Sequence, residues 1–128
     1  MDIPSDQVAL LKSLCETTQD AVILIDRRSR ITYFNSAAVR IFDYQVDEVI
    51  GQHVKILMPE PHASHHDGYM QRYEGTGERQ AIGLIREVEA QRKGGEVFPI
   101  ELSVTELSSG ESVRYGAFIR DVIEKQKL

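Results

Sequence analysis

The last third of the chain most constrains the fold, because it holds three long segments in which apolar and polar residues alternate. These segments cover residues 80–92, 96–108 and 112–124. Alternation with a period of two is typical of strands that bury one face. The dipeptides Gly94-Gly95 and Ser109-Gly110 separate the segments, and such pairs favour the tight turns of hairpins. We therefore expect three antiparallel strands in succession.

The first 73 residues alternate between short strands and short helices. Apolar residues at three- and four-residue spacings predict a helix over 6–18, which Asp20 ends. The further elements expected are a hairpin at 21–25 and 31–34, a helix at 36–42 capped by Asn35, a helical turn at 46–50, an apolar segment at 54–58 and a helix at 61–73. This order predicts an α+β fold, a five-stranded antiparallel sheet with short helices on one face.

Composition limits the kind of protein. A length of 128 residues corresponds to one domain. The formal charge of −5 disfavours nucleic-acid binding, which needs a basic patch. Cys15 is the single cysteine, so an intrachain disulfide and a cysteine-rich metal site are excluded. No apolar run approaches the roughly 18 residues of a membrane span, and we expect a cytoplasmic domain without membrane contact.

The alternation also predicts which strand residues face the helices. The residues expected to point inward are Ile82, Leu84, Arg86 and Val88 in the first long strand, and Phe98, Ile100, Leu102 and Val104 in the second. Arg86 is thus a single cation on an otherwise apolar face. In the third strand, the face of Tyr115, Ala117 and Ile119 competes with that of Phe118 and Val122, and the pattern alone leaves both open.

The predicted helix at 61–73 carries a histidine on its aromatic face. Helical spacing places His62, His66, Tyr69, Met70 and Tyr73 on one stripe. If this stripe packs on the sheet, His66 enters the interior on the side opposite Arg86. A neutral imidazole in an apolar chamber is the kind of axial ligand that haem iron takes, and an arginine across the chamber is a permanent donor for a bound diatomic gas.

Simpler interpretations of the same residues stay open at this point. A histidine on such a helix is often a core or surface residue, and Arg86 can extend past the strand to solvent. His62 and His66, with His65 and Asp67 beside them, can also hold a divalent metal on the helix surface. The polar hairpin tip at 92–96 is expected to be solvated and without special chemistry.

Several segments, in this order, carry a resemblance to a known family. They are Asp20-Ala21-Val22-Ile23-Leu24-Ile25-Asp26, Phe34-Asn35-Ser36-Ala37-Ala38, Glu48-Val49-Ile50-Gly51, Ile56-Leu57-Met58-Pro59-Glu60-Pro61, His66-Asp67-Gly68-Tyr69, Ile82-Gly83-Leu84-Ile85-Arg86-Glu87-Val88 and Phe118-Ile119-Arg120-Asp121-Val122. From about residue 17 to residue 124 the chain resembles a PAS domain. The Met-Pro-Glu-Pro, His-Asp-x-Tyr and Ile-Gly-x-x-Arg segments are similar to the haem-binding PAS domains of FixL-type oxygen sensors.

This resemblance implies a haem b site. The residues it implies are His66, Tyr69, Arg72, Ile82, Leu84, Arg86, Leu102, Val104 and Ala117. His66 matches the axial ligand of the iron, Arg72 an arginine that reaches a haem propionate, and Arg86 the distal arginine that stabilises bound oxygen and swings away from the empty site. Leu102 and Val104 match the apolar distal wall.

Some positions depart from the family pattern. Gln80 stands where a second propionate-binding histidine is common, Ala81 where a bulkier distal residue occurs, Ile85 where glycine is usual, and Ala117 where a glycine lies close to the porphyrin. Alternation places Ile85 on the outer face, where it fits a dimer surface or a helix-packing surface. Flavin is disfavoured, because Cys15 precedes the domain core and the chain has no tryptophan.

We therefore expect a sensory input domain for oxygen, CO or NO that is not itself an enzyme. Residues 1–19 are expected to form a flanking helix, 20–123 the PAS domain, and 124–128 the start of a linker helix. The linker is expected to lead to a histidine kinase, as in two-component systems, or to a cyclic-di-nucleotide enzyme. The flanking helices are expected to form a homodimer. The alternative is a PAS module without cofactor that serves dimerisation and signal relay.

Overall fold

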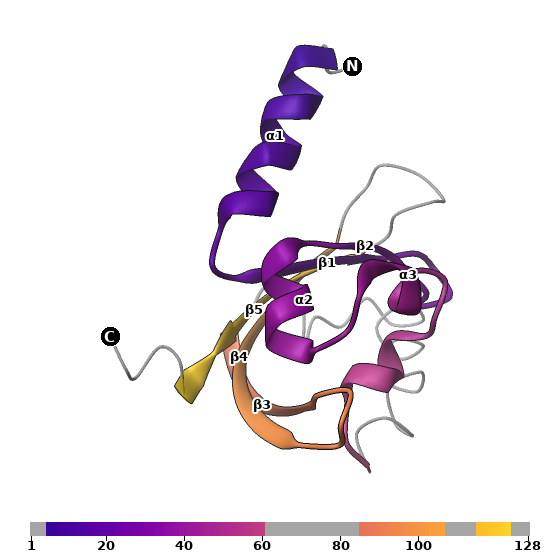
Figure 1. The fold of residues 1–128 in the computed structure, drawn as a ribbon, viewed down its shortest axis with the longest axis vertical. Helices are drawn as coiled ribbons and strands as arrows, with labels where there is room; N and C mark the ends of the chain where they lie inside the picture. The colour runs from indigo at the N-terminus through magenta and orange to yellow at the C-terminus, as the bar shows by residue number, and fades with distance from the viewer. Residues whose placement is uncertain (1–4, 61–84, 107–114, 124–128) are drawn as a thin grey trace.

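The computed structural model describes residues 5–60, 85–106 and 115–123 (Figure 1). Its elements are helix α1 (Ser5–Thr17), strands β1 (Ala21–Ile25) and β2 (Ile31–Phe34), helices α2 (Ser36–Phe42) and α3 (Val46–Val49), the 3-10 helix η1 (Val54–Leu57), and strands β3 (Ile85–Gln91), β4 (Val97–Glu106) and β5 (Tyr115–Asp121). Each agrees with an element expected from the sequence. The helix expected at 61–73 and the turn at Ser109-Gly110 lie outside the described residues.

The five strands form one antiparallel sheet in the order β2-β1-β5-β4-β3. This confirms the predicted α+β fold. β1 and β5 are neighbours although they lie at opposite ends of the chain, and the short helices α2 and α3 lie on one face of the sheet (Figure 1). We call this face the inner face.

Strand pairing determines which side chains share the inner face. Residues that are directly paired across strands point to the same side of a sheet. Arg86 pairs with Leu102, Leu102 with Ile119, and Ile119 with Ala21. In β5, Tyr115, Ala117 and Ile119 therefore face inward, and the side chain of Phe118 on the outer face is 49% exposed. The pairing thus decides between the two faces that the pattern left open.

The core lies between the inner face and α2. The ring of Phe42 is 6.2 Å from that of Phe34 and 5.8 Å from that of Phe98, measured between centroids. Asn35 begins α2 by accepting a hydrogen bond from the backbone N–H of Ala38, as the sequence predicts. The helix ends at Asp43, whose φ of 63° is left-handed. Three aromatic rings from α2, β2 and β4 therefore bring the helix onto the sheet.

The two edge strands of the sheet, β2 and β3, differ in their surroundings. The backbone of β2 is bonded on its free side, because Ile31 donates to Gln52 and accepts from the N–H of Gly51. On β3 the exposed residues Glu87 and Glu89 lie on the outer face. Charged side chains on such a strand oppose the addition of a further strand.

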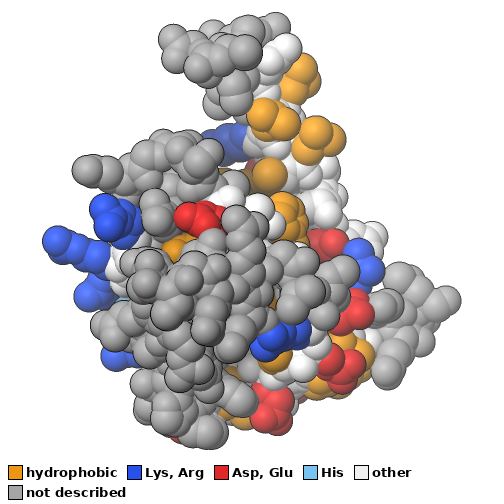
Figure 2. Space-filling view, turned by 180° about the vertical axis from the view of Figure 1, so that it is seen from behind, with side chains coloured by type: hydrophobic (Ala, Val, Ile, Leu, Met, Phe, Trp, Pro, Cys, Tyr) orange, Lys and Arg blue, Asp and Glu red, His pale blue; other side chains and the backbone are white. Residues whose placement is uncertain are grey.

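Helix α1 extends away from the sheet (Figure 1). Hydrophobic side chains gather along one side of it (Figure 2), and those of Leu10, Leu11 and Leu14 are 63%, 51% and 66% exposed. A single 13-residue helix is marginally stable in water without a packed face. Among the described residues, no helix is long and apolar enough to cross a bilayer.

Candidate functional site

The inner face carries an apolar surface at the β4–β5 pair, on the same side of the sheet as Arg86. Leu102, Val104 and Ala117 are partly buried and pack against the core, and Val104 pairs directly with Ala117. We call these three residues the inner wall. Their inward direction agrees with the alternation in the sequence for Leu102 and Val104.

Arg86 lies at one edge of the inner wall. It pairs with Leu102 across the β3–β4 ladder, so its side chain starts from the inner face, and this side chain is exposed. A guanidinium is a permanent cation with five N–H donors. The sheet therefore provides an apolar surface bordered by the exposed, charged donor of Arg86.

Of the nine residues expected to bind haem, the structure describes Arg86 and the inner wall. The others lie outside the described residues, namely His66, Tyr69, Arg72, Ile82 and Leu84. The same holds for His62, His65 and Asp67 of the alternative metal site. Within the part of the chain that the structure describes, no cluster of three or more His, Cys, Asp or Glu residues can hold a metal ion.

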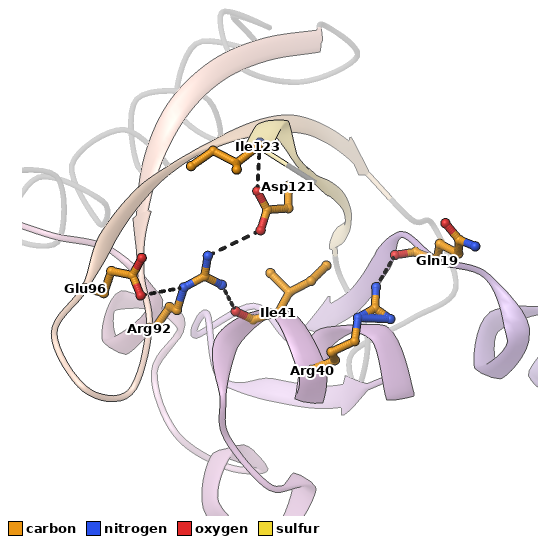
Figure 3. A network of polar contacts seen from close by, with 7 residues as sticks. All are labelled: Gln19, Arg40, Ile41, Arg92, Glu96, Asp121 and Ile123. Carbon is orange, nitrogen blue, oxygen red and sulfur yellow. Dashed lines mark hydrogen bonds and ion pairs between the residues drawn. The ribbon is translucent and has the colours of Figure 1, made fainter. Parts of the chain in front are cut away.

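A polar network at the β3–β4 hairpin was not foreseen from the sequence. Arg92 donates to the backbone oxygen of Ile41, to Asp121 Oδ2 at 3.3 Å and to Glu96 Oε1 at 3.1 Å (Figure 3). Its guanidinium also lies 3.7 Å above the centre of the Phe98 ring. The expectation of a merely solvated tip is therefore wrong, because Arg92 folds back over the sheet toward α2.

Asp121 connects this network to the end of β5. Its side chain is nearly buried, and its Oδ1 accepts a hydrogen bond from the backbone N–H of Ile123 at 3.0 Å (Figure 3). One carboxylate thus binds Arg92 with one oxygen and the residues just after β5 with the other. The hairpin, the C-terminal end of α2 and the end of β5 therefore meet at one ion pair.

Lys93 holds the same hairpin against the helices. Its backbone N–H donates to the oxygen of Phe42 at 3.0 Å, and its ammonium pairs with Glu48 of α3. A hydrogen bond from the Gln45 N–H, together with Lys93, lowers the pKa of Glu48, and the same ion pair raises the pKa of Lys93. The hairpin and the helices therefore form one connected unit.

A second network fixes the joint between α1 and β1. Asn35, which has no exposed surface, donates from Nδ2 to the backbone oxygens of Cys15 and Asp20. Its Oδ1 accepts from the N–H of Val22 at 2.9 Å and of Ala38 at 3.0 Å. One buried amide thus connects the end of α1, the start of β1 and the start of α2. The sequence indicated only its role at α2.

Glu16 secures the last turn of α1 beside Asn35. Its carboxylate accepts hydrogen bonds from the hydroxyl of Tyr33 and, at 2.8 Å, from that of Ser36. These two bonds lower the pKa of Glu16. Burial, followed by the contact with Glu16, raises the pKa of Tyr33 far above its usual range. At neutral pH the pair is therefore a neutral phenol donating to a carboxylate.

The joint is also bound from two further sides. Arg40 of α2 donates to the backbone oxygen of Gln19 at 3.2 Å (Figure 3). Arg120 of β5 donates to both oxygens of Asp20, with both distances 3.1 Å. This contact raises the pKa of Arg120. The sequence predicted that Asp20 ends a helix but did not predict this ion pair, because Arg120 lies 100 residues away and leaves no local pattern.

Comparison with known proteins agrees with this architecture. The family model described as PAS fold matches residues 9–122. The chain is 43% identical over 117 residues to the Sensor protein FixL of Bradyrhizobium diazoefficiens, covering 91% of this chain. It is 26% identical over 106 residues to the Oxygen sensor protein DosP of Escherichia coli, covering 83% of this chain. It spans 23% of the length of the first relative and 13% of the second.

A solved structure shows the same fold. The crystal structure of a PAS domain from Colwellia psychrerythraea superposes with a TM-score of 0.75 at 18% identity, covering 93% of this chain and 99% of that one. At this identity the likeness concerns the fold alone. The matched family model covers most of the chain, so the chain belongs to the PAS family and is related to sensor proteins.

Proposed function

We propose that this chain is a haem-binding PAS sensory domain that responds to oxygen or another diatomic gas. The observation that carries the proposal is the inner wall with Arg86 at its edge. A flat apolar macrocycle needs an apolar surface, and a hydrogen-bond donor beside it can stabilise a bound diatomic ligand. The likeness to a sensor and to an oxygen sensor supports the same conclusion.

The described residues fit such a group. Leu102, Val104 and Ala117 provide an apolar contact surface. Arg86 provides a charged hydrogen-bond donor on an exposed side chain. By the family resemblance His66 would bind the iron, and Arg72 a propionate, with Tyr69, Ile82 and Leu84 as further contacts. Haem supplies an iron atom that binds diatomic gases. The chain's own contribution is to exclude water with the wall and to direct the Arg86 donor.

A displacement of Arg86 has a continuous route to the end of β5. β3 runs from Arg86 to the hairpin, where Arg92 binds Asp121. A second route crosses the paired residues Leu102 and Ile119 directly into β5. Both routes end at the residues that follow β5. We therefore propose that a change at Arg86 alters the order of the chain after Asp121.

The output then lies beyond the PAS domain. We assign residues 20–123 to the sensory domain, 1–19 to a flanking helix and 124–128 to the start of a linker. Because the chain spans less than a quarter of each sensor relative, its partner is proposed to be a fused output domain. A histidine kinase or a cyclic-di-nucleotide enzyme would fit this arrangement.

The test is an absorption spectrum of the purified chain titrated with haemin, reduced with dithionite, and then exposed to CO or air. A Soret band that shifts with each gas is expected. The His66→Ala variant should lose this band. The control variant His53→Ala should keep it, because His53 is the residue that caps η1. Arg86→Ala should bind haem but hold oxygen more weakly. A parent chain that takes up no haemin would refute the proposal.

A second candidate, a PAS module without cofactor that serves dimerisation and relay, is favoured by α1. Leu10, Leu11 and Leu14 leave one side of this helix apolar and exposed, and a second copy of the helix can cover it. Sedimentation should show a dimer that the Leu14→Glu variant disrupts. Val46→Glu, at an exposed hydrophobic residue of α3, is the control that should leave the dimer intact.

A further inference from the structure

The chain enters and leaves the sheet at the same end. β1 and β5 are antiparallel neighbours, and their register begins with Ala21 opposite Ile119. Asp20 immediately precedes this first pair, and Arg120 immediately follows it. The joint that carries α1 and the segment that leaves β5 are therefore direct neighbours in space.

On the side of α1, several hydrogen bonds connect the last turn of α1 and residues 19–20 to α2. Asn35 binds the last turn of α1 and the backbone of Asp20, Glu16 binds Ser36 of α2, and Arg40 of α2 binds Gln19. We therefore expect a tilt of α1 to displace α2 or Asp20, because several hydrogen bonds connect α1 to both.

On the side of β5, two consecutive residues are held from opposite faces. Successive strand residues point to opposite sides of a sheet. Asp121 binds Arg92 on the inner face, while Arg120 binds Asp20 on the other side. The end of β5 thus lies between one ion pair that leads to the hairpin and one that leads to α1.

The Asp20–Arg120 pair is also the part of this connection that can be released. The β1–β5 ladder stops at Ala21 and Ile119, so beyond it the link consists of side chains. These side chains are 31% and 51% exposed for Asp20 and Arg120, and water can replace the bond at low cost. Its two parallel N–H···O contacts nevertheless define one geometry.

We propose that the Asp20–Arg120 pair is a regulatory latch that couples the position of α1 to the order of the segment leaving β5. This inference rests on the proposed function in one respect, namely that the signal leaves through the end of β5. It adds α1 as a second input to that exit. By linkage the coupling is reciprocal, so a change at the exit also changes the equilibrium of α1.

The test is a coupling cycle measured by amide hydrogen exchange on the 128-residue chain without haem or gas. Glu16→Gln loosens α1 by weakening its bonds to Tyr33 of β2 and Ser36 of α2. It should raise the exchange rates of residues 121–123 by about 1.5- to 5-fold, the range that an exposed ion pair can transmit. Rates in the β3–β4 ladder correct for any change in global stability.

Three further variants isolate the latch. In an Arg120→Gln background, Glu16→Gln should no longer change the exchange of residues 121–123. The charge exchange of Asp20→Arg with Arg120→Asp should restore the effect. Arg28→Gln, an exposed arginine in the β1–β2 turn, is the matched control and should leave the coupling intact.

Either of two results would overturn the proposal. One is that Glu16→Gln leaves residues 121–123 unchanged in the parent chain. The other is that its effect is the same with and without Arg120. Because the readout uses neither haem nor gas, a failure of gas sensing and a failure of the latch are distinguished by separate experiments.

Discussion

Asn35 makes a prediction whose size follows from its bonds. Replacement by alanine removes four hydrogen bonds from a fully buried side chain. The N–H groups of Val22 and Ala38 then lose their acceptor in a buried setting, and each such donor costs about 1–3 kcal/mol. The oxygens of Cys15 and Asp20 add less, because both residues are only partly buried and water can reach them. We expect a total loss of about 3–5 kcal/mol.

The assay is thermal and urea unfolding of Asn35→Ala against the parent chain. For 128 residues, each kcal/mol lowers the melting temperature by about 4 °C, so a decrease of roughly 12–20 °C is expected. Asp26→Ala is the matched control. Its carboxylate also accepts two backbone bonds, from Arg28 at 2.9 Å and Arg30 at 3.0 Å, but at an exposed turn. Water replaces these bonds, and we expect a loss below about 1 kcal/mol.

Two outcomes of this comparison would refute the reasoning. If both variants lost the same stability, burial of the acceptor would not decide the cost. If Asn35→Ala lost less than about 1 kcal/mol, the four bonds would contribute no more than a single exposed cap. Hydrogen exchange adds a spatial check, because α1 should lose its protection together with the first residues of β1.

Three further predictions concern other parts of the molecule. Arg92→Leu should cost about 2–4 kcal/mol in urea unfolding, because it removes the cation that binds the nearly buried Asp121 carboxylate; if adding Asp121→Asn recovers none of this loss, the ion pair is not its cause. The pKa of Glu16 is lowered in the folded state, so its carboxylate stabilises the fold at a pH above the ordinary pKa of 4.5. This stabilisation is lost as the pH falls through the folded-state pKa. In a pH series, the melting temperature of the parent should therefore fall more steeply on acidification than that of Glu16→Gln. Phe42→Ala should cost about 3–5 kcal/mol in the same assay, since it empties the space between two rings; a loss below 1 kcal/mol would contradict the packing.

Local patterns were enough to predict the elements and the inward direction of β4. Alternation reports burial of one face, and Phe98 and Ile100 are indeed buried. The face of β5 needed its neighbours, because Tyr115 and Phe118 are both apolar and only the pairing with β1 and β4 separates them.

Side chains with distant partners were beyond the reach of such patterns. Arg92 lies in a polar tip like many solvated arginines, yet its partners Ile41 and Asp121 are 51 and 29 residues away. Asp20 and Arg120 are likewise separated by 100 residues. The spacing of residues in a sequence contains no information about such distances, so only the folded arrangement identifies both arginines. His66 and the other residues expected on the helical side of the haem site remain predictions.

The two acidic residues on the outer face of β3 have a consequence for how copies of this domain meet. A strand that paired with β3 would have to bring its backbone beside Glu87 and Glu89. If that strand were β3 of a second copy, its own two glutamates would add two more carboxylates beside the first two. These carboxylates therefore disfavour pairing of β3 between two copies, even where fusion to an oligomeric protein raises the local concentration of the domain. The exposed leucines of α1 offer another copy an apolar contact that these carboxylates do not.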